Sequence, residues 1–310
     1  MTDLQRKELW GHSTISRTTI HGWPAVFLSL PVIGAGIFII LISVNVIPVE
    51  DSGFHASREV VASFGGLFAL AGILMLIHGL TSLKEKRKAA LLSQPYSTEK
   101  WRADYPWDPQ GTKADSFEKI KSGLYANLGI TVFCVPFNWM FFVKHPDRIF
   151  QLFIGFFDII IVIAWAYWIY LVLAFLKYGV STLEFQHCPF FLGEELKVIL
   201  HTNKPVPGLK EMKVTLRHIE EKYETRGTGK NRKSVIVSYQ MYADTLTLNN
   251  LTAFDQQAVQ WPLAFSLPQE SRYNTCLSCR PAKYWELEIK AQTLGIDYCS
   301  SFLLPVYAKL

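Results

Sequence analysis

The chain has 310 residues, half of them hydrophobic, with 31 Lys and Arg, 26 Asp and Glu and a formal net charge of +5. This length and composition indicate a membrane protein with room for a second, water-facing domain. The basic residues lie beside apolar runs or alternate with acids, which excludes a nucleic-acid binder.

Four apolar runs are each long enough to cross a bilayer as a helix. Such a helix rises about 1.5 Å per residue and needs about 20 residues to cross about 30 Å of hydrocarbon. The runs cover about residues 24–47, 60–80, 124–143 and 149–176. The sequence therefore predicts an α-helical membrane domain of four transmembrane helices over residues 24–178, after an N-terminal segment over residues 1–23.

Small residues recur along one face of the second run. Gly65, Ala69 and Gly72 are spaced four and three residues apart, so they share one side of a helix. Such a face lets another helix approach closely, and it predicts tight packing of the first two spans.

Basic residues near the ends of the spans predict their orientation. The connection over residues 82–122 carries nine Lys or Arg residues, whereas the connections at 48–59 and 144–148 carry two or fewer each. Basic connections stay in the cytoplasm, so the connection over 82–122 is assigned there. Four crossings then put both ends of the chain on the cytoplasmic side.

From residue 179 onward the hydrophobic period changes to two. Alternating apolar residues recur in about seven short segments, separated by turn sequences such as KPVPG, RGTGKN and LPQES. The pattern predicts an all-β sandwich domain over residues 179–310, in which each sheet buries one face.

The closing segment, YWELEIKAQTLGIDYCSSFLLPVY, resembles the end of an arrestin-like β-sandwich, in which a W-x-L-x-V-x-A strand, a Gly-x-Asp-Tyr turn and a final F-x-x-P-V strand recur. Trp285, Leu287 and Ile289 would then point into the sandwich, Gly295 would make the turn and Phe302 would close the core. The whole chain is also similar to a group of bacterial multi-pass proteins of unknown function, in which a loop with a Pro and Trp motif, here YPWDPQG, precedes two spans and such a domain. This similarity implies a bacterial inner-membrane location and no particular activity.

Asp158 is the most informative polar residue of the predicted spans. It lies about 13 Å deep by helical rise, where a carboxylate is costly unless it is protonated, paired or wetted. One interpretation is a proton or cation relay. We favour a structural acid that is hydrogen-bonded to a neighbouring span, with Thr131, Asn127 or Ser29 as its partner, and we expect Asn138 to bond across helices in the same way.

Cys276 and Cys279 form a C-x-x-C pair. The pair is half of a zinc site, whose other ligands would have to be Cys188 or His187 together with Cys299. A redox pair would open a helix after a strand, whereas this one lies between strands. The odd count of five cysteines favours reduced thiols, so we expect two free loop cysteines, no bound metal and no cofactor.

Three clusters are candidates for partner or lipid contact. The basic run after the second span attracts anionic lipid headgroups, or it only keeps the connection that follows on the cytoplasmic side of the membrane. The basic turn of the sandwich contacts a partner or membrane, or only keeps a hairpin soluble. The aromatic residues of the connection over residues 82–122, which we call the inner loop, should be shielded from water, and we expect them to pack on the sandwich. The residues are Lys84, Lys86, Arg87 and Lys88 in the run; Lys222, Arg226, Lys230, Arg232 and Lys233 in the turn; and Trp101, Tyr105 and Trp107 in the loop.

The sequence contains no recognisable catalytic set. It lacks a phosphate-binding glycine loop, a G-x-S-x-G elbow and an H-E-x-x-H motif, and Glu194, Glu195, Glu220 and Glu221 are predicted to be solvated. We therefore expect a membrane scaffold or adaptor that presents the sandwich to a cytoplasmic or membrane protein, with lipids or a second copy as further contacts. The alternative is a transporter or channel subunit in which Asp158 carries protons or a cation.

Overall fold

The computed structural model describes residues 7–9, 12, 15, 23–48, 58–93, 100–139, 142, 148–206, 209, 211–227, 232–249 and 259–309. The chain divides into two compact units. The helical unit consists of Thr18–Leu92 and Lys121–Ile169, and the sheet-bearing unit of Met1–Arg17, Ser93–Ile120 and Tyr170–Leu310. Three separate parts of the sequence thus build the sheet-bearing unit.

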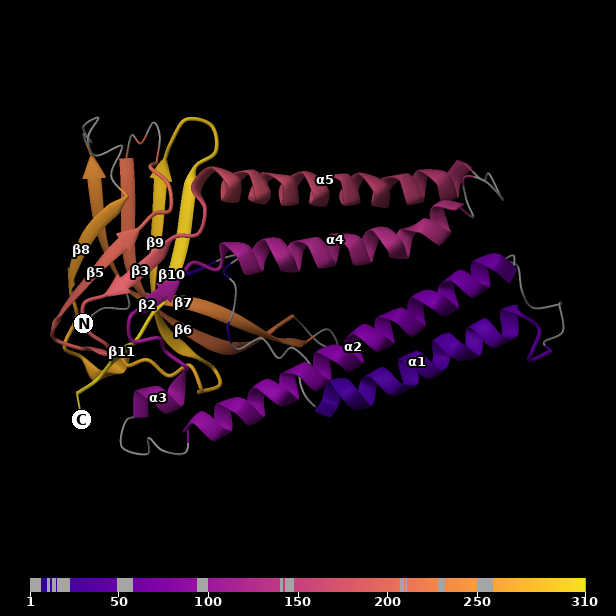
Figure 1. Ribbon diagram of the computed structural model, residues 1–310, viewed down its shortest axis with the longest axis horizontal. Coiled ribbons are helices and arrows are strands. Elements are labelled where there is room, and N and C mark those ends of the chain that lie inside the picture. The colour runs from indigo at the N-terminus through magenta and orange to yellow at the C-terminus, as the bar shows by residue number, and fades with distance from the viewer. Residues whose placement is uncertain are drawn as a thin grey trace. The chain divides into compact units, whose positions relative to one another are not determined.

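Four helices are long and apolar enough to cross a membrane, as predicted. They are α1 (Trp23–Ser43), α2 (Arg58–Ser93), α4 (Ser116–Asn138) and α5 (Arg148–Tyr178), and the short α3 (Lys100–Asp104) lies between α2 and α4 (Figure 1). Helix α2 continues past the predicted end of its span, so the basic run is helical. Helix α4 begins before the predicted residue 124, because the acidic first turn at Glu118 favours a helix start.

Helices α1 and α2 pack through small residues. A Cβ atom on Gly36 would lie 2.7 Å from the carbonyl oxygen of Gly65, and one on Gly65 would lie 2.8 Å from the carbonyl oxygen of Gly36. A Cβ on Gly72 would meet the backbone nitrogen of Ile33 at 2.8 Å. The two backbones are too close for larger residues, which confirms the predicted packing face of Gly65, Ala69 and Gly72.

Two sheets face each other in the sheet-bearing unit (Figure 1). Among the described residues, one sheet has the order β1-β7-β6-β9-β10 and the other the order β2-β3-β5-β8. The first contains β1 (Lys7–Glu8), β6 (Glu211–Arg226), β7 (Lys233–Asn249), β9 (Lys283–Gln292) and β10 (Tyr298–Leu304), and the second β2 (Gly111–Lys113), β3 (Thr182–Phe185), β5 (Glu195–His201) and β8 (Gln260–Ser266). The short β4 (Phe190–Phe191) and β11 (Val306–Tyr307) pair in parallel. The predicted class of apolar helices followed by a β-sandwich is confirmed.

The alternating apolar residues of the closing segment point into the core between the sheets. Trp285, Leu287 and Ile289 are fully buried, and Phe302 is 2% exposed. Gly295 adopts a φ angle of +82° between β9 and β10, a conformation that glycine adopts without steric cost. These positions confirm the predicted orientation of the segment.

Two edge strands come from outside the C-terminal part of the chain. Lys7 on β1 pairs with Gln240 on β7, and Gly111 on β2 pairs with Glu184 on β3. Both strands are too short to show an alternating pattern, and the sequence predicted neither. The N-terminal segment and the connection between α2 and α4 therefore both belong to the sandwich.

The end of α5 is fastened to the turn between β9 and β10. Lys177 Nζ donates to the carbonyl oxygens of Leu294 at 2.8 Å and Ile296 at 3.0 Å. The hydroxyl of Tyr178 lies 2.7 Å from the hydroxyl of Thr293. The junction at which helical sequence gives way to strands is thus held by direct hydrogen bonds.

Candidate functional site

A buried ion cluster lies on the face of the five-stranded sheet that points away from the main core. Arg217 Nε donates to Glu286 Oε2 at 3.0 Å, and its Nη2 donates to Glu288 Oε1 at 3.2 Å. His12 Nε2 lies 2.9 Å from the same oxygen of Glu286. Only 9% of the Arg217 and Glu286 side chains is exposed. Charges at this depth are tolerated only where each has a partner.

The pKa of Glu286 reflects these contacts. Burial raises that pKa, whereas the hydrogen bond from His12 and the charge of Arg217 lower it. The lowering effects together are larger than the effect of burial, so the pKa of Glu286 lies below its ordinary value of 4.5. Glu286 is therefore an ionised acceptor at neutral pH. An acid held in this state suits structural pairing better than proton donation.

A groove of about 670 Å³ opens beside this ion cluster. Its charged lining residues are Lys7, Glu8, Lys213, Arg217, Glu288 and Lys290, and His12 lies among them. Lys7, Lys213 and Lys290 are exposed, whereas Arg217 is buried in its pairs. The groove therefore offers a mixed, mainly basic surface for binding.

The N-terminal segment lies along the same face of the sheet. The backbone nitrogen of Leu9 donates to the carbonyl oxygen of Ser238 at 2.9 Å, and that of Ile15 donates to Glu221 Oε1 at 2.5 Å. Glu221 is fully buried, so the prediction that it is solvated is wrong. The reason is that the N-terminal segment packs against Glu221, and strand periodicity does not reveal a contact with a segment so distant in sequence.

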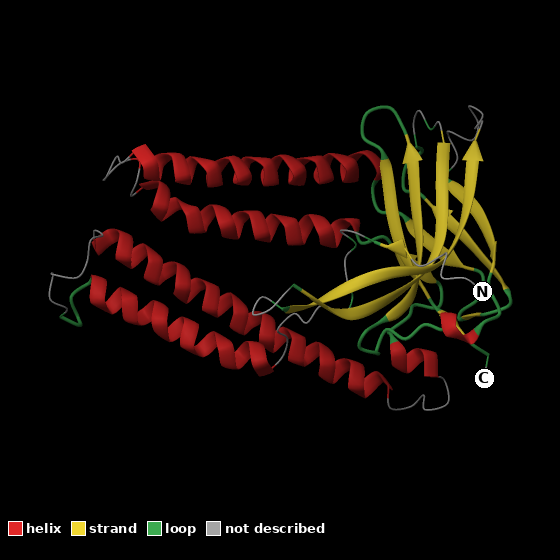
Figure 2. Cartoon of the chain, turned by 180° about the vertical axis from the view of Figure 1, so that it is seen from behind, coloured by secondary structure: helices red, strands yellow, loops and turns green. Residues whose placement is uncertain are grey.

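Strands β6 and β7 continue beyond the rest of their sheet as a two-stranded ribbon (Figure 2). β9 pairs with β6 only as far as Glu220, whereas β6 and β7 stay paired up to Arg226 and Lys233. We call residues 222–226 and 233–237 the ribbon. Tyr223 is 48% exposed on it.

The ribbon and its turn bring together most of the predicted basic turn. Lys222 is partly exposed, and Arg232 and Lys233 are exposed. Arg226 is bound to Glu8 at 2.8 Å and to Glu224 at 3.2 Å, so it fastens the ribbon to the N-terminal strand. Lys230 lies outside the described residues.

The predicted basic run lies on the C-terminal part of α2. Lys84 and Arg87 are exposed there. Lys86 and Lys88 belong to the same helix, and their side chains lie outside the described part of the chain. The run is thus a charged helical end that is suited to an anionic surface.

The aromatic residues of the inner loop differ in their surroundings. Trp107 Nε1 donates to the hydroxyl oxygen of Tyr307 at 2.9 Å, so this ring docks on the sandwich, as expected for the loop. The Tyr105 ring centroid lies 4.7 Å from that of Trp107, and Tyr105 remains 40% exposed. Trp101 is half-buried, with the guanidinium carbon of Arg102 at 4.9 Å from its ring centroid.

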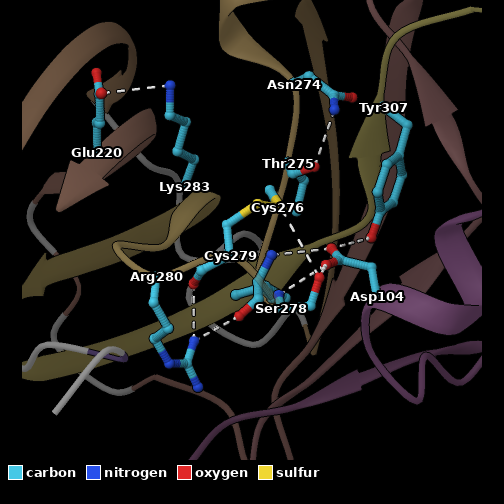
Figure 3. Close-up of a disulfide and its surroundings, with 11 residues drawn as sticks. Asp104, Glu220, Asn274, Thr275, Cys276, Ser278, Cys279, Arg280, Lys283 and Tyr307 are labelled. Atoms are coloured by element: carbon cyan, nitrogen blue, oxygen red, sulfur yellow. Dashed lines mark hydrogen bonds and ion pairs between the residues drawn. A yellow bond between two sulfur atoms is a disulfide. The ribbon is translucent and has the colours of Figure 1, made fainter. Parts of the chain in front are cut away.

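Cys276 and Cys279 are joined by a disulfide (Figure 3). The Cys276 backbone nitrogen donates to the carbonyl oxygen of Lys283 at 2.8 Å, and the reverse bond is 3.0 Å long. These two backbone hydrogen bonds close a tight loop, and the disulfide lies within it. The prediction of two free loop cysteines is therefore wrong, because the odd cysteine count says nothing about local loop geometry.

The disulfide loop binds the carboxylate of Asp104, which ends α3 (Figure 3). Asp104 Oδ1 accepts hydrogen bonds from the Ser278 backbone nitrogen at 2.8 Å and from Ser278 Oγ at 2.7 Å. Asp104 Oδ2 accepts from the Leu277 nitrogen at 3.0 Å and from the Tyr307 hydroxyl at 2.9 Å. Burial raises the pKa of Tyr307, so the hydroxyl keeps the proton that it donates. Four donors on one carboxylate make a strong anchor for the connection between α2 and α4.

Metal binding at the cysteine pair is not supported. The two sulfur atoms are bonded to each other, which removes the pair as the half-site of a zinc centre. Within the described residues, no group of three or more His, Cys, Asp and Glu side chains is placed to hold a metal ion.

Asp158 is paired with a neighbouring helix, but not with the residue predicted. Asn138 Nδ2 on α4 donates to Asp158 Oδ1 on α5 at 3.0 Å. The predicted partners Thr131, Asn127 and Ser29 are wrong, because α4 and α5 bring the end of one helix beside the start of the other. Ser29 instead donates to a carbonyl oxygen of its own helix at 2.7 Å.

The other two predicted partners also join α4 to α5. Asn127 Nδ2 donates to the carbonyl oxygen of Ala164 at 3.2 Å, and Trp165 Nε1 donates to Thr131 Oγ1 at 3.0 Å. Polar contacts of this kind hold apolar helices together.

Sequence reasoning missed the buried ion cluster and the Asp104 anchor. A signal was present in β9, where Glu286 and Glu288 alternate with buried apolar residues. Arg217 occupies the corresponding face of β6. Nothing in the sequence near His12 or Asp104 indicates which distant residues they contact.

Two solved structures show a distant likeness to part of this chain. No family model and no curated protein matches the chain. Spo0M, a sporulation control protein from Bacillus subtilis, matches 42% of this chain and 49% of its own at 16% identity, with a TM-score of 0.24. A β-glucosidase from Listeria innocua, solved with gluconolactone, matches 42% of this chain and 16% of its own at 10% identity, with a TM-score of 0.18. The chain thus spans about half or less of these proteins, and nothing about its function follows from them.

Proposed function

We propose that the chain is an integral protein of a bacterial inner membrane that acts as a scaffold or adaptor. Four apolar helices anchor it, and its β-sandwich stands at the cytoplasmic face, where it binds a protein partner. Confinement to the membrane raises the local concentration of the sandwich and of whatever it holds. The proposal assigns no catalytic step.

The composition of the sheet-bearing unit supports the proposed topology. Strand β1 precedes α1, β2 lies between α2 and α4, and the remaining strands follow α5. Strands on opposite sides of a bilayer cannot pair with each other. The three segments therefore belong on one side, and the basic end of α2 at Lys84 and Arg87 favours the cytoplasm.

The observation that carries the proposal is the ribbon. It projects beyond β9, with exposed Tyr223 on one face and partly exposed Lys222 and exposed Lys233 on the other, while exposed Arg232 directly precedes Lys233. Tyrosine and arginine are residue types that protein contact surfaces favour. The charge favours a partner with an acidic segment, since complementary charge speeds and orients association.

The test compares two full-length variants in native membranes. One variant carries Lys222→Ala, Arg232→Ala and Lys233→Ala. The matched control removes the same charge from exposed sites elsewhere on the sandwich, by Lys197→Ala, Arg272→Ala and Lys309→Ala. Equal melting temperatures of the purified chains establish that both variants fold.

Quantitative affinity capture after cross-linking is the measurement. We expect the proteins captured by the wild-type chain to persist with the control and to fall about tenfold with the ribbon variant, since three rim charges together contribute about that much. Equal recovery by the ribbon variant would refute the assigned contact surface. Loss of anionic-lipid binding alone would assign the ribbon to the membrane instead.

A further inference from the structure

We infer that Cys276 and Cys279 are a site of reversible thiol–disulfide exchange with a dithiol reductant, and that their oxidation state controls how firmly the connection between α2 and α4 is held on the sandwich. The inference concerns a site that the adaptor proposal does not use. It rests on the proposed function only for the cytoplasmic placement that would expose the pair to cellular dithiols.

The disulfide is accessible at one end. Cys279 is exposed, and so are its neighbours Ser278 and Arg280, whereas Cys276 is half-buried. Exchange requires a thiolate to reach one sulfur in line with the bond. The Cys279 sulfur is therefore the point of attack, and Cys276 is the leaving group.

A fixed cation stands next to the attacked residue. The Arg280 Nη1 atom donates to the carbonyl oxygens of Leu277 at 2.9 Å and Cys279 at 3.0 Å, which ties the guanidinium to the disulfide loop (Figure 3). Positive charge beside a cysteine stabilises its thiolate. The loop is thus suited to release and take back a thiolate at Cys279.

The proposed location also favours a reversible bond. Disulfides in the cytosol are rare, and those that form there are usually transient or redox-sensing. A sandwich at the cytoplasmic face would meet dithiol reductants continually. A C-x-x-C pair in that setting is more consistent with exchange than with a permanent brace.

The exchange balances as a two-electron transfer. A thiolate of the reductant attacks Cys279 Sγ, the bond to Cys276 Sγ breaks, and Cys276 takes up a proton as a thiol. The second thiolate of the reductant then attacks the reductant sulfur that is bonded to Cys279, and the bond to Cys279 Sγ breaks. Cys279 leaves as a thiolate and takes up the second proton that the dithiol has released. The reductant leaves as a disulfide, and the chain holds two thiols.

Asp104 connects this chemistry to the rest of the molecule. Three of the hydrogen bonds to its carboxylate come from Leu277 and Ser278, which lie between the two cysteines. Without the cross-link these donors lose their fixed positions. The backbone bridge between Cys276 and Lys283 does not need the disulfide, so the change is confined to the loop and to the segment that Asp104 anchors.

That segment carries the loop aromatics. Tyr307 donates to Asp104 and accepts the hydrogen bond from Trp107, so all three residues belong to one network. Reduction would therefore loosen residues 100–113, including Trp107 and Tyr105. The redox state of the pair would decide whether this part of the inner loop is docked.

The first measurement counts thiols in the full chain, held in lipid nanodiscs. The chain is equilibrated in buffers of reduced and oxidised dithiothreitol, alkylated with N-ethylmaleimide after denaturation, and analysed by peptide mass spectrometry. We expect Cys134, Cys188 and Cys299 to be labelled in all buffers, and Cys276 and Cys279 only in reducing ones. Labelling of the pair in oxidising buffer, or resistance to reduction without denaturant, would overturn the inference.

The second measurement follows amide hydrogen exchange in both states. We expect peptides covering residues 100–113 and 277–278 to exchange about tenfold faster after reduction, while β5 stays unchanged, because hydrogen bonds to a charged group are lost. Cys276→Ser with Cys279→Ser should show the fast rate in either buffer, and Cys299→Ser should behave as the wild-type chain. Asp104→Asn should speed exchange of residues 100–113 with the disulfide intact. Equal rates in both states would refute the inference, and since no partner enters these measurements, they stand apart from the capture experiment.

Discussion

Arg217 and Glu286 face each other on β6 and β9, and Arg217 Nε donates to Glu286 Oε2 over 3.0 Å at a place where only 9% of either side chain is exposed. His12 reaches the same carboxylate from the N-terminal segment. Through this contact of His12, the ion cluster ties the N-terminal segment that precedes α1 to strands that follow α5. We expect its removal to affect both the stability of the sandwich and the docking of that segment.

Replacement of Arg217 by Met should destabilise the sandwich strongly. It leaves the buried carboxylate of Glu286 without the Arg217 cation, a change that costs about 3–5 kcal/mol of unfolding free energy. Thermal unfolding of the full chain in detergent, followed by near-UV circular dichroism, measures the loss. Lys290→Met on the same face is the control, and since Lys290 is 60% exposed it should change stability by less than about 1 kcal/mol. Similar melting of the two variants would contradict the structural role of the cluster.

His218 should make the sandwich sensitive to mild acid. It is 1% exposed beneath Tyr273 and Trp285, and burial, reinforced by the charge of Lys283, lowers its pKa from 6.5 to about 3. Between about pH 3 and pH 6.5, His218 is therefore protonated in the unfolded chain and neutral in the folded chain. The stability contributed by neutral His218 is therefore present above pH 6.5 and falls by about 1.4 kcal/mol per pH unit below it.

The measurement compares melting at pH 6.5 and pH 5.0, where Glu286 with its lowered pKa remains ionised. We expect His218→Phe to keep the ring packing and to remove about 2 kcal/mol of the acid-induced loss. His187→Phe, at an exposed position, serves as the control and should retain the wild-type dependence. An unchanged pH dependence in His218→Phe would show that another group is responsible.

Most of the fold could be predicted from periodicity. Trp285, Leu287 and Ile289 alternate with polar residues and are buried as predicted, and the small-residue face of α2 meets α1 at Gly36. Patterns of this kind predict structure because burial repeats with the geometry of the helix or strand. They depend only on residues that are close in sequence.

The site could not be predicted because its members are brought together from separate segments. His12 lies 274 residues from Glu286, and Asp104 lies 174 residues from Ser278. β1 and β2 are too short to show an alternating hydrophobic pattern, so the local sequence does not indicate that their segments join the sheets. The disulfide depends likewise on the bridge between Cys276 and Lys283, which is a property of the folded loop.

Gly36 should be a sensitive position in the helical unit. A Cβ there would lie 2.7 Å from the carbonyl oxygen of Gly65, so Gly36→Ala must push α1 away from α2. Overpacking of this kind costs about 1–3 kcal/mol. Gly34→Ala is the matched control on the same helix, because a Cβ there meets no atom of the described chain within 4 Å. The melting temperature in detergent should fall for Gly36→Ala alone; equal values would mean that the helices do not touch at Gly36.

The pairing of Asn138 with Asp158 separates the adaptor interpretation from the transporter interpretation. Asp158→Asn retains a hydrogen-bonding partner for Asn138, so we expect unchanged folded yield and melting temperature. Asn138→Leu removes the donor to Asp158 and should cost about 0.6–2 kcal/mol, seen as a lower melting temperature. Val135→Leu, at an exposed position of the same helix, is the control for added bulk.

Proton flux into proteoliposomes supplies the deciding measurement. For an adaptor, flux through the wild-type chain equals that of empty vesicles, and Asp158→Asn changes nothing. For a relay, the wild-type chain conducts and Asp158→Asn abolishes conduction while the folded amount stays the same, since the amide cannot release a proton. The direct bond from Asn138 at 3.0 Å favours the first outcome, because it occupies one carboxylate oxygen with a helix-to-helix contact.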